Sequence, residues 1–204
     1  MKRKFTALRY LVGALSINLA VGLVCLAQQA TGQQRPAGQT PAAQAAPKDL
    51  PTGIAGTIAE WTRAKDYTKE YLDVMPEDGY AFRPTPDIRS FAEQMLHLAS
   101  ANFMFAARIT GQANPQQGKN LEKMDELKSK AAVTKVVLES YDFALNAIKG
   151  ADPAKLSQKV NLFNVNMTGE AALAKAFEHQ THHRGQTTIY LRLKGAKPPQ
   201  EKLF

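Results

Sequence analysis

Apolar side chains recur every three or four residues in four long segments of the chain, and this periodicity constrains the fold more strongly than any other feature. The segments extend over residues 53–74, 90–109, 127–148 and 168–194. Each is long enough for a helix of several turns, and turn-forming residues follow each of them. The periodicity therefore predicts an all-α fold, a four-helix bundle formed by one domain.

The ends of these segments carry local start and stop signals. Ser90 and Glu93 form a capping box at the start of the second segment, and Gly111 follows its end. Gly195 follows the fourth segment. The apolar stripe of the second segment is expected at Phe91, Met95, Leu98, Phe105 and Ile109. The inward seam of the third is expected at Leu127, Ala131, Thr134, Leu138, Tyr141, Leu145 and Ile148.

The stretch between the third and fourth segments has a different pattern. Apolar and polar side chains partly alternate over residues 156–167, which is typical of an extended chain. We expect a short extended segment that crosses the end of the bundle. No other stretch has a convincing strand pattern, and the chain contains no internal repeat.

The N-terminus has the pattern of an export signal. Four basic residues lie within the first ten positions, and an almost wholly apolar stretch follows. Small residues at Cys25 and Ala27 predict cleavage after Ala27, so residues 1–27 are expected to direct export to the periplasm or the medium and to leave no membrane association. An uncleaved anchor stays open, because the apolar stretch approaches the roughly 20 residues that span a bilayer. Lipidation of Cys25 is disfavoured because Val24 stands where a small residue is required.

The next segment has the composition of a linker. Residues 28–49 are rich in Gln, Ala, Pro and Gly and contain no large apolar side chain. Such a segment cannot bury enough apolar surface to offset the entropy lost on ordering. We therefore expect a disordered linker over residues 28–49 and a folded domain over residues 50–204.

Charge and cysteine content exclude several classes of protein. The chain carries 26 Lys and Arg against 18 Asp and Glu, but beyond its first ten positions the balance is 22 to 18 and the basic residues are scattered. This pattern disfavours binding to nucleic acid. Cys25 is the single cysteine, which excludes a disulfide framework and a Cys-rich metal site. Its removal with the signal peptide would also remove any thiol nucleophile.

Three of the four histidines lie close together in the fourth segment. His179 and His183 are one helical turn apart, the spacing at which two imidazoles bind one metal ion. Their side of the helix projects toward the core with Ala176 and also carries Gln186, whereas His182 is expected at the edge of this face. Buried polar groups need partners, and a metal ion would supply them. A pair of hydrogen-bonded core histidines is the alternative.

A third imidazole would have to come from another helix, and His97 in the second segment is the remaining histidine. It projects roughly 120° from the centre of the apolar stripe of its helix. On spacing alone, an exposed histidine on the helix flank and a metal ligand are equally consistent with the sequence.

One run in the fourth segment is distinctive. Residues 179–186 read HQTHHRGQ, and residues 190–192 read YLR. Upstream, residues 80–84 read YAFRP and precede the segment that carries His97. Together these stretches resemble the closing helix, a loop and the second helix of the DinB (DinB/YfiT-like) superfamily, and the resemblance covers residues 50–199.

The resemblance implies an up-down-down-up bundle with a divalent metal ion, usually zinc or nickel, held by one histidine of the second helix and two of the fourth. In this sequence these are His97, His179 and His183. Three histidines leave a coordination position for water or substrate, as in catalytic sites. Arg184 and Gln186 are the candidate catalytic residues. Arg184 would orient an anionic group or form a surface ion pair, and Gln186 would hold a bound water or a ligand imidazole.

The family includes metal-dependent transferases that move a low-molecular-weight thiol to an electrophile, as well as thiol-dependent isomerases. The resemblance therefore implies a hydrolase or thiol S-transferase that activates a water or a thiol toward a small-molecule substrate. Export argues against the thiol reaction, because such cosubstrates are mostly cytosolic. The alternative is a non-catalytic, metal-stabilised periplasmic module, in one version a homodimer. The enzyme would have a cleft, which we expect to be lined by Phe91, Asn102, Tyr141 and Phe163; the module would have a closed coordination sphere.

Overall fold

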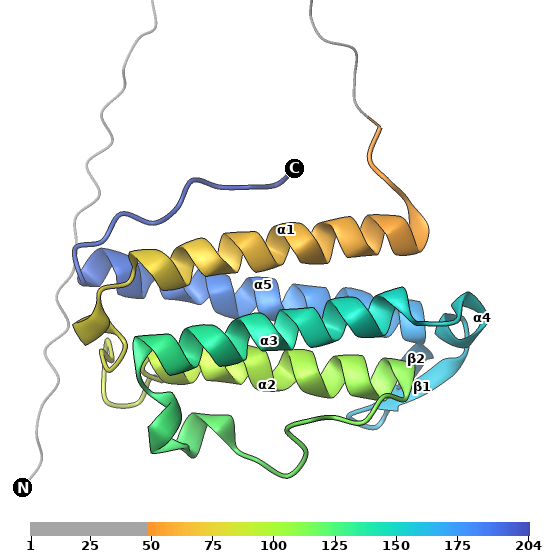
Figure 1. The fold of residues 1–204 in the computed structure, drawn as a ribbon, viewed down its shortest axis with the longest axis horizontal. Helices are drawn as coiled ribbons and strands as arrows, with labels where there is room; N and C mark the ends of the chain where they lie inside the picture. Colours follow the sequence, from red (N-terminus) through yellow and green to blue (C-terminus); the bar gives the residue numbers. More distant parts are fainter. Residues whose placement is uncertain (1–48) are drawn as a thin grey trace, which may run out of the picture. The chain divides into compact units, whose positions relative to one another are not determined.

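The computed structural model describes residues 49–204, in which four long helices lie side by side (Figure 1). They are α1 (Gly53–Val74), α2 (Phe91–Thr110), α3 (Lys130–Lys149) and α5 (Gly169–Leu193). Both α1 and α2 pack against α3 and α5. In Figure 1, α1 and α5 run in one direction and α2 and α3 in the other. The prediction of a mostly helical fold with four main helices is confirmed.

Short elements connect the main helices. They are η1 (Glu77–Gly79), η2 (Leu121–Lys123), η3 (Asp125–Leu127), α4 (Pro153–Leu156), β1 (Lys159–Leu162) and β2 (Val165–Thr168). The two strands pair antiparallel as a hairpin at one end of the helices (Figure 1). The single extended segment expected here is therefore a pair of strands, because pairing satisfies backbone groups that one strand would leave without partners.

The predicted signal peptide over residues 1–27, and all of the predicted linker except Asp49, lie outside the described residues. Across residues 49–204, none of the helices combines the length and the apolar character that crossing a bilayer requires.

The helix ends follow the local signals in the sequence. The Ser90 side chain accepts a hydrogen bond from the backbone of Glu93, and the Glu93 carboxylate accepts one from the backbone of Ser90, so the capping box is confirmed. Gly111 ends α2 in the left-handed conformation that glycine favours. Ser129 caps α3, so this helix begins after Leu127, which lies in η3 instead.

The buried face of α3 differs from the predicted seam in its first half. Ala131 is exposed, whereas Val133 and Val137 are fully buried. Since α3 packs against both α1 and α2, its buried face is wider than a single stripe and is centred near Val137 rather than Leu138. In the second half, the residues buried as predicted are Tyr141, Leu145 and Ile148. The stripe predicted for α2 is buried throughout.

Candidate metal centre

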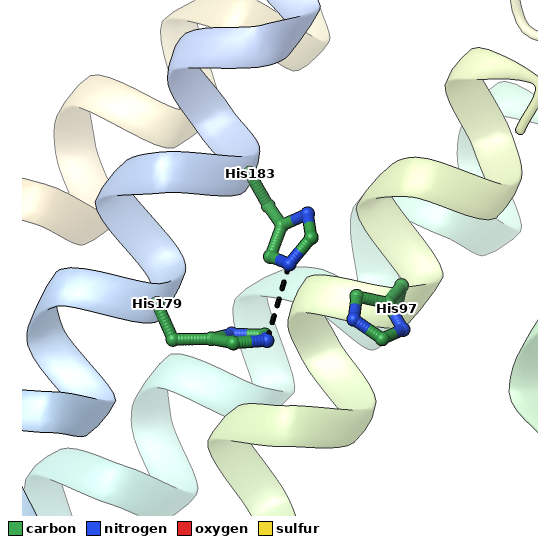
Figure 2. Close-up of side chains that lie close together, drawn as sticks. All are labelled: His97, His179 and His183. Carbon is green, nitrogen blue, oxygen red and sulfur yellow. Dashed lines mark hydrogen bonds between the residues drawn. The ribbon is translucent and has the colours of Figure 1, made fainter. Parts of the chain in front are cut away.

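Three histidines from two helices converge between α2 and α5. His97 lies on α2, and His179 and His183 lie on α5 (Figure 2). One ring nitrogen of each lies within 4.8 Å of the others. The ring centroids of His179 and His183 are 4.3 Å apart, and that of His97 is 4.5 Å from His183 and 5.3 Å from His179. The structure thus brings together the three side chains that the family resemblance implies as ligands.

The pair on α5 follows from regular helix geometry. Thr168 caps α5, since its side chain accepts a hydrogen bond from the backbone of the first turn. Residues four apart on the continuous helix share a face, and Nε2 of His179 lies 3.1 Å from Nε2 of His183 (Figure 2). His182 is exposed beside them, at the edge of the cluster.

His97 reaches the cluster because α2 is covered on several sides. Helices α3 and α5 pack against α2, and η2 packs against it as well. The flank of the predicted apolar stripe is therefore not a solvent-facing side. His97 is half-buried there, with its ring close to His183 on α5 and its Nδ1 atom close to Glu122 in η2.

Glu122 orients His97 from behind. Its Oε1 atom lies 2.7 Å from Nδ1 of His97, and its Oε2 atom accepts a hydrogen bond of 2.6 Å from Nε of Arg89. Desolvation by itself would raise the pKa of Glu122, but the hydrogen bonds from Arg89 and His97 outweigh it and lower this pKa below its ordinary value. Because an ionised carboxylate only accepts, His97 donates from Nδ1 and keeps the Nε2 lone pair for the cluster.

Two glutamines hold the outer nitrogen of His183. Its Nδ1 atom lies 2.7 Å from Nε2 of Gln94 and 3.2 Å from Oε1 of Gln186, and the two glutamines are hydrogen-bonded to each other. Nε2 of Gln186 also lies 3.0 Å from Nε2 of His182. These contacts leave Nε2 of His183 directed toward His179 (Figure 2). Gln186 therefore contacts an imidazole of the cluster, which is one of the two positions expected for it.

Burial and mutual proximity keep the two histidines of α5 neutral. Desolvation, with repulsion from His97 and His182, lowers the pKa of His179 to about 4. Desolvation, with repulsion from His179 and His97, lowers the pKa of His183 to about 3. Neutral imidazole is the form that binds metal ions, so both side chains are in the ligating state near pH 7.

The side chains present fit a divalent cation. Nδ1 of His179 is buried and has no hydrogen-bond partner among residues 49–204, so this ring, unlike the other two, is not held from behind. Its Nε2 atom faces that of His183, and a cation between the rings would accept both lone pairs. Three imidazole nitrogens form a donor set common to zinc and nickel. The three-His cluster could therefore hold a metal ion.

Arg184 lies in the core rather than beside the cluster. Its guanidinium carbon is 4.6 Å from the ring centroid of Tyr67, and its Nη1 atom donates a 3.0 Å hydrogen bond to Oε1 of Gln180. It follows His183 by one residue and therefore points roughly 100° away around the helix. Both roles expected for Arg184 require an accessible guanidinium, whereas this one is buried.

Most of the residues expected to line a cleft are also in the core. Phe91, Asn102 and Tyr141 are buried, and of the four only Phe163 is exposed. Asn102 and Tyr141 instead belong to buried hydrogen bonds that join α2 and α5 to α3. Residues on the inward stripes of long helices fill the space between those helices, so a cleft has to form where other elements meet.

Two open hollows lie near the cluster instead. One, of about 410 Å³, is formed by the hairpin, Phe105 of α2 and the face of α5 that carries His179. The other, of about 940 Å³, contains the side chains that hold His97 and His183 from behind, namely Glu122, Gln94 and Gln186. Acidic and basic groups balance in its lining, which includes Arg83, Arg89, Lys123, Asp87, Glu93 and Glu122. The smaller, apolar hollow thus meets His179 directly, whereas the larger, more polar one reaches the side chains that contact His97 and His183.

Two of the residues that contact His97 and His183 were not predicted from the sequence. Glu122 is 25 residues from His97 and lies in a connection, so no helical spacing relates the two. Gln94 precedes His97 by one turn of α2 and shares its side of the helix, so an i, i+3 search from each histidine would have found it.

The known proteins to which this chain is similar are DinB-like proteins. The sequence model described as the DinB family matches residues 53–203. The chain is 27% identical over 143 residues to the uncharacterized protein YjoA of Bacillus subtilis (strain 168), across 68% of this chain and 88% of YjoA. The crystal structure of that DinB-like protein matches with a TM-score of 0.57 at 23% identity, across 72% of this chain and 96% of YjoA. A DinB-like protein from Bacillus cereus ATCC 10987 matches with a TM-score of 0.63 at 20% identity, across 73% and 97% of the two chains.

Proposed function

The chain belongs to the DinB family, and we propose that it is an exported metalloenzyme in which His97, His179 and His183 hold one zinc or nickel ion. When bound, the cation supplies Lewis-acid activation of a water or a low-molecular-weight thiol for attack on an electrophilic small molecule. The protein would then be a hydrolase or a thiol S-transferase. The observation that carries this function is the convergence of three imidazole nitrogens within 4.8 Å of one another beside open hollows.

The side chains around the ligands support a preformed site. Glu122 accepts the Nδ1 proton of His97, which fixes the ring and makes its Nε2 atom a stronger donor. Oε1 of Gln186 lies where it accepts the Nδ1 proton of His183, and in that tautomer Nε2 of His183 is free to bind a cation. Three protein ligands, rather than four, suit a site that admits a nucleophile.

Hydrolysis fits the predicted export better than thiol transfer does. Low-molecular-weight thiol cosubstrates are mostly cytosolic, whereas water is present in every compartment. The single cysteine, Cys25, lies within the predicted signal peptide, so the mature chain would contain no thiol of its own. The attacking group therefore has to enter from outside the chain.

Metal analysis of the purified protein tests the site. We expect about one ion per chain in the unmodified protein, loss of that ion in His97→Ala and His183→Ala, and its retention in His182→Ala. His182 is the matched control because it neighbours His183 in sequence but is exposed. Equal metal content in His183→Ala and the unmodified protein would remove His183 as a ligand and with it the proposed centre.

Turnover is tested separately, with a panel of ester hydrolysis, amide hydrolysis and thiol-transfer assays run with and without a chelator. We expect activity that the chelator abolishes and that zinc or nickel restores. A metal-loaded protein that is inactive across the panel, or whose activity is insensitive to the chelator, would instead be a non-catalytic, metal-stabilised module. Sedimentation of the same samples would then show whether that module is a dimer.

A further inference from the structure

The β1–β2 hairpin has one apolar face and one polar face. Register pairs Leu162 with Val165 and Val160 with Met167, so these four side chains share a face. The opposite face carries Asn161 and Asn166, whose side chains hydrogen-bond to each other at 2.9 Å, together with Lys159 and Thr168. The apolar face forms part of the wall of the 410 Å³ hollow, where Leu162, Val165 and Met167 lie.

The turn of this hairpin holds a phenylalanine in an unfavourable position. Phe163 and Asn164 have φ angles of 51° and 65°, both in the left-handed region. A two-residue hairpin loop with positive φ at both positions favours asparagine or glycine, and a bulky residue is rare there. Phe163 is nonetheless 76% exposed, so burial within the chain does not offset the strain. Strained residues of this kind cluster at functional sites.

A row of rings leads from this turn to the histidine cluster. The ring of Phe163 lies 6.0 Å from that of Phe105, edge to face, and the ring of Phe105 lies 5.8 Å from that of His179. The lining between them is apolar, and its polar groups are His179, His182 and the Lys175–Glu178 ion pair. The hollow is therefore lined both by a candidate ligand and by the exposed phenylalanine of the turn.

We propose that this hollow, the hairpin pocket, binds the apolar group of the substrate, a short alkyl chain or a single aromatic ring, and so directs the reactive centre of the molecule to the histidine cluster. The statement that the bound molecule is a substrate rests on the proposed function. The volume of about 410 Å³ lies within the range of roughly 300–1,000 Å³ that is typical of small-molecule sites. The lining of the second hollow carries three basic and three acidic side chains, so a larger share of it is polar than in the hairpin pocket.

The first experiment measures binding to the hairpin pocket in the absence of metal. A series of 4-alkylphenols, from methyl to butyl, is titrated into chelator-treated protein while the methyl signals of [13C-methyl]methionine are followed by NMR. We expect the Met167 signal to shift, with affinity rising about threefold to fourfold per methylene. Met75 and Met95 are fully buried elsewhere, so their signals serve as internal controls.

The second experiment measures binding to the same pocket by ligands that are anchored at the metal ion. Alkyl hydroxamates, from acetyl to octanoyl, are titrated by calorimetry into the zinc-loaded protein, so that a metal-binding head group anchors a tail of increasing length. We expect the affinity to rise with tail length by a similar factor until the pocket is filled.

Phe163→Asn is the discriminating variant, because asparagine tolerates the left-handed conformation and removes the apolar ring. We expect it to flatten the chain-length dependence in both series, with a thermal midpoint equal to or above that of the unmodified protein. Asn166→Ala, on the outer face of the same hairpin, should leave both series unchanged. If Phe163→Asn were to give an undiminished chain-length dependence, the pocket assignment would be wrong.

The two series also separate the two proposals. Phenol binding at Met167 without hydroxamate binding would retain the pocket and reject the metal centre. Hydroxamate binding that is independent of tail length, with no phenol shift at Met167, would retain the metal centre and reject the pocket. Sedimentation as a dimer that Phe163→Asn converts to a monomer would assign the face to a second copy of the chain and would also reject the pocket.

Discussion

Helix α5 carries polar side chains on two inward faces, and the two groups differ in how their polar atoms are paired. On the face toward α1 and α3, Oε1 of Gln180 accepts hydrogen bonds from Tyr141 and Arg184, at 2.7 and 3.0 Å. On the face toward α2, Nε2 atoms of His179 and His183 oppose each other, and a third imidazole faces both of them (Figure 2). In the first group the hydrogen bonds join three different side chains, whereas in the second a 3.1 Å Nε2–Nε2 hydrogen bond joins two imidazoles at the point where a cation could take both lone pairs.

The difference shows how to distinguish a structural polar cluster from a functional one. Both groups are polar and largely buried, and His183 and Arg184 are adjacent in sequence. The network of hydrogen bonds around Gln180 joins α1, α3 and α5 and stabilises their packing. Imidazole nitrogens that converge beside an open hollow instead have the arrangement expected of a binding site. Polarity and burial alone therefore do not identify the site.

The largest effect that separates the two faces is expected for Arg184→Ala. Loss of the guanidinium removes the contact with Tyr67 and the hydrogen bond to Gln180 and leaves a cavity, so the free energy of unfolding should fall by about 3 kcal/mol. Metal content should be retained. Chemical denaturation with metal analysis checks both, and His183→Ala should show the opposite result, with metal lost and the stability of the metal-free protein little changed.

A smaller effect is expected for Glu122→Gln. The amide no longer offers His97 an ionised acceptor, so metal affinity should fall about tenfold or more. Competition with a chromophoric chelator measures this affinity. Glu126 in the adjacent η3 turn is exposed and makes Glu126→Gln a suitable control. Equal affinities in the two variants would mean that Glu122 does not support the site.

Tyr141→Phe tests the hydrogen bonds around Gln180 with a smaller structural change. Removal of the hydroxyl leaves Thr68 and Gln180 each with one fewer buried partner, at a cost of about 1 kcal/mol in the free energy of unfolding. Thermal or chemical denaturation measures the change. An equally stable variant would show that this part of the network is not needed for the packing of α5 on α3.

Acid is also expected to separate the two groups, although solvent in the open hollows weakens the effect. The pKa of His179 is lowered from 6.5 to about 4, and that of His183 from 6.5 to about 3. Between these values and pH 6.5 the unfolded chain binds more protons than the folded one, so the stability of the metal-free protein should decrease as the pH falls below 6.5 and be constant above it. Thermal midpoints from pH 4 to 8 test this. Arg184→Ala should lower the midpoint similarly at every pH.

Local signals were sufficient for the helix boundaries and for part of the site. The capping box of Ser90 and Glu93 and the glycine at 111 act within one turn of the chain, and α2 begins and ends where they indicate. The one-turn spacing of His179 and His183 is likewise a local property, and the two rings meet as expected.

Predictions failed where a side chain depends on more than one neighbouring element. The seam of α3 was misplaced because α3 packs against two helices, and Ala131 is exposed as a result. The environment of Arg184 depends on Tyr67 of α1, a residue that no sequence spacing relates to it.

The sequence by itself determined the helices, their caps and the spacing that places two imidazoles on one face, because these depend on hydrogen bonds and side-chain directions within a few residues. Only the tertiary structure decided that His97 meets that pair, that Glu122 orients it and that Arg184 lies in the core. Those outcomes depend on which side of α2 is covered by α5 and η2, and that is set by packing between segments far apart in the chain.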